Sequence, residues 1–331
     1  MNARNEKLDL AKLLACIGVV GLHGVGMVNY TLYYLFTFSV PMFFMVSGYL
    51  MFSKEKITFR YSFRKALSYI RIILAWNIIM IVPIYIFRHK PINPFKESLR
   101  CILQQGYLWH FWFFGTMVIL FLLLPLFHGH LKKYPLLHIS LTAVFLICLL
   151  VMNIVSMRKE TCPMLGIPQS LRLNVFGFYF LLGGVFVIDK VRGIVSKLPW
   201  YFYGILSLIF CVLSNFGQKH LGLYLYHTRL AEYFYSEFFV FVWIMFLFLF
   251  ILNIPLENLS ERIRTSKFFP KGNLTLGIFI IHPILLYVVD KLQLVPTCLS
   301  AILTWIGLFF VSALISLILN KIPVIRRLVK L

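Results

Sequence analysis

Three side chains near the start of the sequence combine charge and acid–base chemistry within an otherwise apolar stretch. Asp9 and Lys12 are three residues apart, so on a helix they are neighbours that can pair. His23 follows eleven residues after Lys12, about three helical turns, which puts both on one helix face roughly 16 Å apart. Lys12 can attract an anionic group, and a neutral imidazole can accept a proton at physiological pH. The spacing suits an elongated substrate with an anionic end and a reactive end.

Each of these residues also has a simpler interpretation. A histidine inside a membrane helix can be held neutral by a neighbouring helix, and a lysine near a helix end commonly extends to the lipid headgroups. The shared face makes the pair of Lys12 and His23 more informative than either residue alone.

Further polar residues lie in or beside apolar stretches, where they are costly and often mark function. The pair Ser47–Gly48 allows close helix packing. His110 and Trp112 begin a later stretch, as the residues of an aromatic belt do. Arg172 begins another stretch and can extend outward, whereas His282 falls inside one.

These side chains stand out because the chain is so apolar. Of its 331 residues, 60% are hydrophobic and 13% are charged, against about 25% charged in a soluble domain. This composition excludes a soluble globular protein, and disorder would need low hydrophobicity. A membrane-spanning helix needs about 20 apolar residues. The candidate spans are approximately 10–28, 32–52, 67–87, 109–127, 136–155, 172–188, 200–216, 236–254, 273–290 and 298–319.

The predicted fold is an all-α, polytopic integral membrane bundle of about ten transmembrane helices. Ten spans leave no room for a separate soluble domain, so we expect one domain over 1–331, with its chemistry in the helices or short loops. Asp9 and Lys12 interrupt the apolar stretch before Cys16. We therefore expect the first span to be retained as a helix rather than cleaved as a signal peptide.

The formal charge of +21 could suggest a nucleic-acid partner. The basic residues lie between apolar runs instead of on one solvated face, so we expect membrane lipids and no nucleic acid around the chain. With a cytoplasmic N-terminus, twenty of the 32 Lys and Arg residues fall in inner segments and nine in outer ones. The positive-inside rule then predicts that both termini are cytoplasmic.

The six cysteines show no metal-ligand spacing, and we expect no metal. Cys101 and Cys162 fall in predicted outer loops, where a disulfide is permitted. The sequence carries no signal for an oligomeric state.

The order of these motifs resembles acyltransferase family 3, a family of integral membrane O-acyltransferases. The resemblance covers essentially the whole chain, although each matching segment is weak alone. The matching segments are Asp9 with Lys12 and His23; 41–50, which reads PMFFMVSGYL; 110–113, with Pro125 expected to end that helix; Arg172 with 179–183; and 277–283, which reads GIFIIHP.

The resemblance implies a multi-pass protein of the bacterial cytoplasmic (inner) membrane that carries out O-acetylation. An acetyl group would pass from cytoplasmic acetyl-CoA, or a slightly longer group such as succinyl from the corresponding acyl-CoA, to a hydroxyl of a cell-surface polysaccharide or its lipid-linked precursor. His23 would act as a general base or carry the acyl group covalently. The expected catalytic residues are His23, Asp9 and Lys12; those for acyl-CoA are Lys12, Arg64, Lys65 and Arg71; those for the acceptor are Ser47, His110, Trp112, Arg172 and His282.

A different class of function is a transporter or flippase that moves glycans or small molecules without acylating them. Broken helices and polar residues at the membrane midplane would serve transport equally well. No pair of interrupted spans repeats in two halves of the sequence, which slightly disfavours an inverted-repeat transporter. A structural scaffold would not need Lys12 and His23 on one face.

Overall fold

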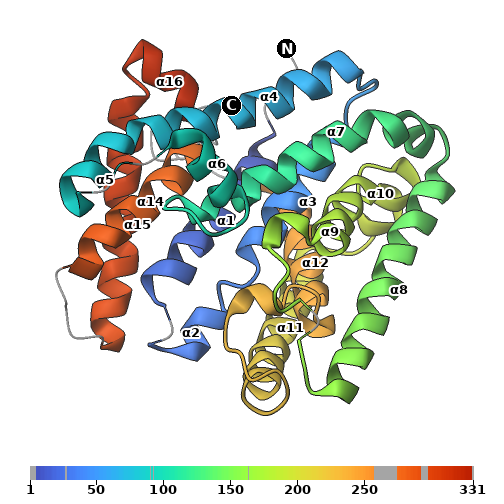
Figure 1. The fold of residues 1–331 in the computed structure, drawn as a ribbon. Coiled ribbons are helices and arrows are strands. Elements are labelled where there is room, and N and C mark those ends of the chain that lie inside the picture. The colour runs from blue at the N-terminus through green and yellow to red at the C-terminus, as the bar shows by residue number, and fades with distance from the viewer. Residues whose placement is uncertain are drawn as a thin grey trace.

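The chain folds into a bundle of helices, as the hydropathy pattern predicts (Figure 1). The computed structural model describes residues 5–26, 28–89, 91, 93–162, 164–256, 274–291 and 297–329, and all regular elements in these ranges are helical. The longer helices are α1 (Glu6–Gly24), α3 (Ser39–Phe52), α4 (Phe59–Ile79), α7 (Trp112–Lys133), α8 (Pro135–Lys159), α9 (Leu173–Val185), α11 (Trp200–His220), α12 (Phe238–Asn253), α14 (Thr275–Lys291) and α15 (Cys298–Leu319). The shorter segments are α2 (Tyr30–Tyr34), α5 (Ile81–Arg88), α6 (Pro94–Ile102), η1 (Trp109–Phe111), η2 (Gln169–Leu171), α10 (Asp189–Val195), η3 (Leu221–Leu225), η4 (Ala231–Tyr233) and α16 (Pro323–Val329).

Each of the ten predicted spans overlaps one of these helices, and six helical segments of the described chain are long and apolar enough to cross a membrane. The helices α9 and α12 are apolar but shorter. In α8, α11 and α15 only 17–22% of the apolar stretch is buried inside the protein, which fits helices that face lipid. The six segments are Tyr30–Phe52, Phe59–Ile86, Trp109–Lys133, Pro135–Lys159, Trp200–Leu225 and Cys298–Leu319. The count of ten spans and the orientation of the termini stay predictions.

The prediction that Pro125 ends its helix was wrong. Helix α7 continues through Pro125 to Lys133. A proline inside a helix removes one backbone donor, here the one that would reach the carbonyl of Phe121. Membrane helices tolerate this loss because the freed carbonyl can be satisfied locally.

Two glycines let α3 and α9 cross at close range. A Cβ built on Gly48 would lie 1.8 Å from the carbonyl oxygen of Phe180, and one on Gly183 would lie 2.0 Å from that of Met45. Both distances are far below van der Waals contact. The close approach expected from Ser47–Gly48 is therefore confirmed.

Helix α1 runs through the bundle in contact with α3, α12, α14 and α15. Gly24 packs against the backbone of Trp305, whose indole Nε1 donates to the carbonyl of Ile17 at 3.1 Å. These contacts place the polar residues of α1 inside the protein. The basic residues Arg262, Arg264, Lys267 and Lys271, which the sequence assigns to an inner segment, lie outside the described residues.

Candidate active site

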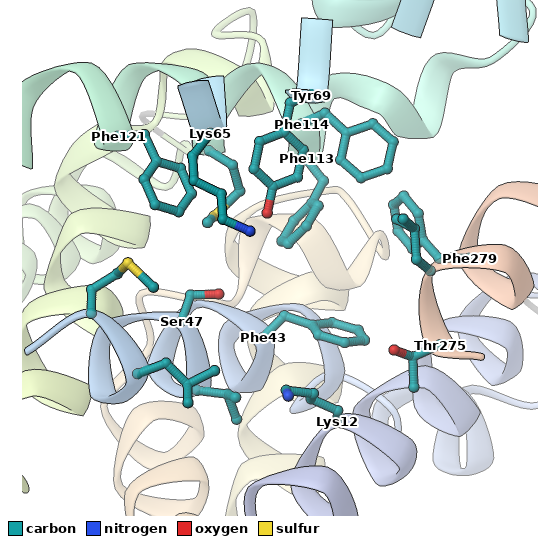
Figure 2. A pocket seen from close by; sticks show the side chains of 15 residues that line it. Lys12, Phe43, Ser47, Lys65, Tyr69, Phe113, Phe114, Phe121, Thr275 and Phe279 are labelled. Carbon is teal, nitrogen blue, oxygen red and sulfur yellow. The ribbon is translucent and has the colours of Figure 1, made fainter. Parts of the chain in front are cut away.

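A cavity of about 230 Å³ lies at the end of the bundle where α1 begins. Its lining comes from α1, α3, α4, α7 and α14 and is mostly apolar, but five polar side chains reach it, Thr275 of α14 among them. Figure 2 shows Lys12 and Lys65 on opposite sides of this space, with the hydroxyls of Ser47 and Tyr69 also directed into it. We call it the inner cavity, because the predicted orientation puts it on the cytoplasmic side.

The ion pair predicted between Asp9 and Lys12 is confirmed. The Nζ atom of Lys12 lies 3.3 Å from Oδ1 of Asp9. Asp9 is buried and does not line the cavity, whereas the side chain of Lys12 remains partly exposed to it. Asp9 therefore holds the ammonium of Lys12 at the cavity wall.

Of the three basic residues expected on α4, the structure brings only Lys65 to the inner cavity. Lys65 and Tyr69 are four residues apart, so they share the helix face that lines the cavity. Arg64 and Arg71 are exposed and are not among the lining residues. Each is turned about 100–120° away from Lys65 at 100° per residue.

A second cavity of about 260 Å³, the outer cavity, lies at the other end of α1. His23 reaches it from α1, and further polar and aromatic groups come from α2, η1, the start of α7, η2, η4 and the loop after η4. These are Tyr33, Trp109, His110, Trp112, Gln169, Glu232 and Tyr235. The two cavities share three lining residues, Phe43, Phe113 and Phe279, so they lie end to end.

Three histidines gather beside the outer cavity, although they are far apart in the sequence. The ring of His23 stacks on that of His282 at 5.4 Å and meets the edge of Trp109 at 4.8 Å between centroids. The ring of His110 lies 6.0 Å from that of His282. This contact between α1, η1 and α14 fixes the orientation of the His23 ring.

His282 is fully buried and is not part of the cavity lining. Its Nδ1 lies 3.0 Å from the carbonyl oxygen of Ile278. A carbonyl only accepts, so Nδ1 carries the proton in this contact. His110 does line the cavity, and among the described residues neither of its ring nitrogens has a hydrogen-bond partner. His110 can thus form a hydrogen bond with a ligand in the outer cavity, whereas His282 packs against His23 and holds its ring in place.

The structure assigns Arg172 to the wall behind the outer cavity instead of to its lining. Its guanidinium donates to the backbone carbonyls of Ile167 at 2.9 Å and Glu232 at 3.0 Å, and lies 3.6 Å from Oε1 of the Glu232 carboxylate. It also covers the ring of Tyr233 at 4.7 Å. Burial raises the pKa of Tyr233, and the nearby Glu232 adds to this, whereas the charge of Arg172 lowers it.

The carboxylate of Glu232 is held from several sides. Its Oε2 accepts from Nε2 of Gln104 at 3.0 Å and from Nε2 of Gln169. The carbonyl Oε1 of Gln169 is buried and has no partner among the described residues. Because Glu232 and Gln169 both line the cavity, they present hydrogen-bond acceptors of fixed orientation to a hydroxyl-bearing ligand.

Sequence reasoning missed Glu232, Gln169 and Trp109 as cavity residues. Glu232 lies in a loop before a predicted span, and a carboxylate at this position is equally compatible with an ordinary residue of the membrane interface. Trp109 fits an aromatic belt. Gln169 carries no sequence signal. Trp112, which was expected, does line the outer cavity and stacks on Phe176 at 5.1 Å.

The structure does not pair the two cysteines of the predicted outer loops. Cys101 and Cys162 are both free and buried. In the described part of the chain, no group of three His, Cys, Asp or Glu side chains is placed to hold a metal ion.

Comparison with known proteins agrees with the resemblance seen in the motifs. A family model described as an acyltransferase domain matches residues 5–321, nearly the whole chain. Together with the apolar helices, this match defines the class: an integral membrane acyltransferase that crosses the membrane several times. The chain belongs to acyltransferase family 3. Searches of the curated proteins and of the solved structures found no match.

Proposed function

We propose that this acyltransferase moves an acetyl or other short acyl group from cytoplasmic acyl-CoA to a hydroxyl of a cell-surface glycan or its lipid-linked precursor, in the bacterial cytoplasmic membrane. One observation carries the proposal: two cavities lie end to end along α1, one with two lysines and one with His23 and Glu232. The first suits an anionic donor and the second a polyhydroxyl acceptor.

The inner cavity accounts for the donor. The phosphates of acyl-CoA would meet Lys12 and Lys65, because ammonium groups bind phosphate by charge and by several donors. The narrow pantetheine arm would follow the apolar wall toward the outer cavity. Its length is on the order of the roughly 16 Å that separates Lys12 from His23 along α1.

The outer cavity accounts for the acceptor. Glu232 and Gln169 would accept hydrogen bonds from sugar hydroxyls, while Trp109 and Trp112 would pack against the sugar ring. His110 would act as a further hydrogen-bonding group. Ser47, which lines the inner cavity, would meet the arriving thioester instead of the sugar.

In the general-base route, His23 takes the proton of the acceptor hydroxyl as its oxygen attacks the thioester carbonyl. The carbon–sulfur bond then breaks, and the CoA sulfur leaves with the proton. In the covalent route, a His23 nitrogen attacks first and releases CoA, and the acceptor hydroxyl then takes the acyl group from the ring. Incubation with labelled acyl-CoA and no acceptor distinguishes the routes: stable label on the protein, lost in His23→Ala, supports the covalent one.

The function is tested with purified protein in lipid nanodiscs, labelled acetyl-CoA and a lipid-linked saccharide. We expect label on the saccharide, loss of transfer in His23→Ala and retention in His130→Ala, which removes an exposed histidine. Undiminished transfer by folded His23→Ala would contradict the assignment of His23. If reconstituted vesicles move the saccharide across the bilayer with no acyl label on it, the protein is a transporter.

A further inference from the structure

Three phenylalanines from three different helices separate the inner cavity from the outer one. Phe43 of α3, Phe113 of α7 and Phe279 of α14 line both cavities. The ring centroids of Phe43 and Phe113 are 5.8 Å apart, and those of Phe113 and Phe279 are 5.5 Å apart. Figure 2 shows the three rings lining the inner cavity together with Lys12 and Lys65. We call these three residues the aromatic septum.

The septum is braced from behind. Phe113 contacts Phe44 at 5.0 Å, and Phe279 contacts Phe114 at 5.3 Å between ring centroids. Phe279 is buried, whereas Phe43 and Phe113 keep part of their surface exposed to the cavities. Rings packed at these distances form an apolar barrier between the two cavities, which opposes the passage of bulky or well-hydrated groups.

We propose that the aromatic septum selects the acyl group by size and keeps water of the outer cavity away from the donor thioester. The proposal rests on the function proposed above. The cationic groups lie on one side of the septum, and His23 and Glu232 lie on the other. The reacting carbonyl must therefore pass between the three rings to meet the acceptor, and a longer acyl chain would have to displace them.

The septum is also linked to the histidines. Phe279 contacts the ring of His110 at 5.3 Å and that of His282 at 6.1 Å. A ring movement that opens the passage thus shifts the groups that orient His23. Through these contacts, passage of the acyl group between the rings would be coupled to the orientation of His23.

A poorly closed septum would permit one specific side reaction. The oxygen of a water molecule attacks the thioester carbonyl, the carbon–sulfur bond breaks, and the proton goes to the CoA sulfur. The products are the free carboxylic acid and CoA, with no acylated acceptor. The ratio of CoA released to acyl group transferred therefore measures the closure of the septum.

The experiment compares wild type with Phe113→Ala, Phe113→Leu and Phe113→Trp, using acetyl-CoA and butyryl-CoA in nanodiscs. For the alanine variant we expect roughly a tenfold rise in CoA released per transfer, and a similar rise in the kcat/KM ratio of butyryl-CoA to acetyl-CoA, the scale of pocket discrimination between methylenes. The leucine variant should change both ratios in the same direction by less. The tryptophan variant should transfer less while binding acyl-CoA with unchanged Kd.

The matched control is Phe121→Ala, because Phe121 lines the inner cavity and not the outer one. Unchanged ratios in both the alanine and the leucine variants, or the same change in Phe121→Ala, would overturn the septum. If the alanine variant does not fold, the leucine and tryptophan variants decide. Failure of the wild type to acylate any acceptor would instead overturn the proposed function, and the septum with it.

Discussion

The two lysines of the inner cavity allow a direct test of how the donor is held. We consider Lys12→Ala and Lys65→Ala, with Arg64→Ala as control. All three variants remove one positive charge, and Arg64 precedes Lys65 in the chain. Only Lys12 and Lys65 line the cavity, so only their replacement should weaken the binding of CoA appreciably.

The expected magnitude follows from the surroundings of each ammonium. A hydrogen bond to a charged group contributes about 1.5–3 kcal/mol, and about 1.4 kcal/mol is a factor of ten in Kd. Lys12 shares its charge with Asp9 at 3.3 Å, so Lys12→Ala should raise Kd about tenfold. Lys65 has no carboxylate partner among the described ion pairs. Lys65→Ala should therefore raise the Kd for CoA by up to about 100-fold.

The assay is calorimetric titration of the detergent-solubilised protein with CoA, which separates binding from chemistry. The effect of both lysines should shrink at high salt, because added ions screen partly exposed charges. Arg64→Ala should change Kd by less than about twofold, as for an exposed charge. Equal losses of affinity for Arg64→Ala and Lys65→Ala would refute the assignment of the inner cavity as the donor site.

Four further predictions test the fold, the outer site and the orientation in the membrane. Gly48→Ala should lower the free energy of unfolding by about 1–3 kcal/mol, because the added Cβ would clash with a backbone carbonyl of α9. Gly193→Ala should leave the free energy of unfolding unchanged, because its Cβ would meet open space. Glu232→Gln leaves the buried guanidinium behind it without its carboxylate, so the melting temperature should drop by the equivalent of about 3–5 kcal/mol; an unchanged melting curve would contradict this. In single-cysteine variants, exposed Cys298 should react with an impermeant maleimide outside intact cells, and labelling only after permeabilisation would contradict the predicted orientation. Burial raises the pKa of the Cys162 thiol. The Cys162 thiol should therefore react with maleimide at least about tenfold more slowly than that of Cys298.

Features that depend on helix periodicity were predictable from the sequence. The Asp9–Lys12 pair and the placement of Lys12 and His23 on one face of one helix need only 3.6 residues per turn. The close packing at Gly48 follows from a residue that has no side chain. In each case the residue types and their spacing along one helix are enough to determine the arrangement.

Features that depend on which helices meet were not predictable. The sequence holds 34 phenylalanines, and nothing in their spacing marks Phe43, Phe113 and Phe279 as a set. Arg172 looks like a membrane-anchoring or ligand-binding cation until its carboxylate partner Glu232, 60 residues away, is known. Likewise, basic residues adjacent in the sequence differ in role, because one residue along α4 turns a side chain by about 100°.

Because Lys12 and His23 lie on one continuous helix, α1 fixes both the distance and the angle between the two ends of the site. Inserting or deleting one residue between them changes their separation by only about 1.5 Å but rotates His23 by about 100°, away from Trp109 and His282. The angle is therefore more sensitive than the length. A chain that uses this site can vary many side chains of the intervening segment, yet it cannot change the number of residues in it.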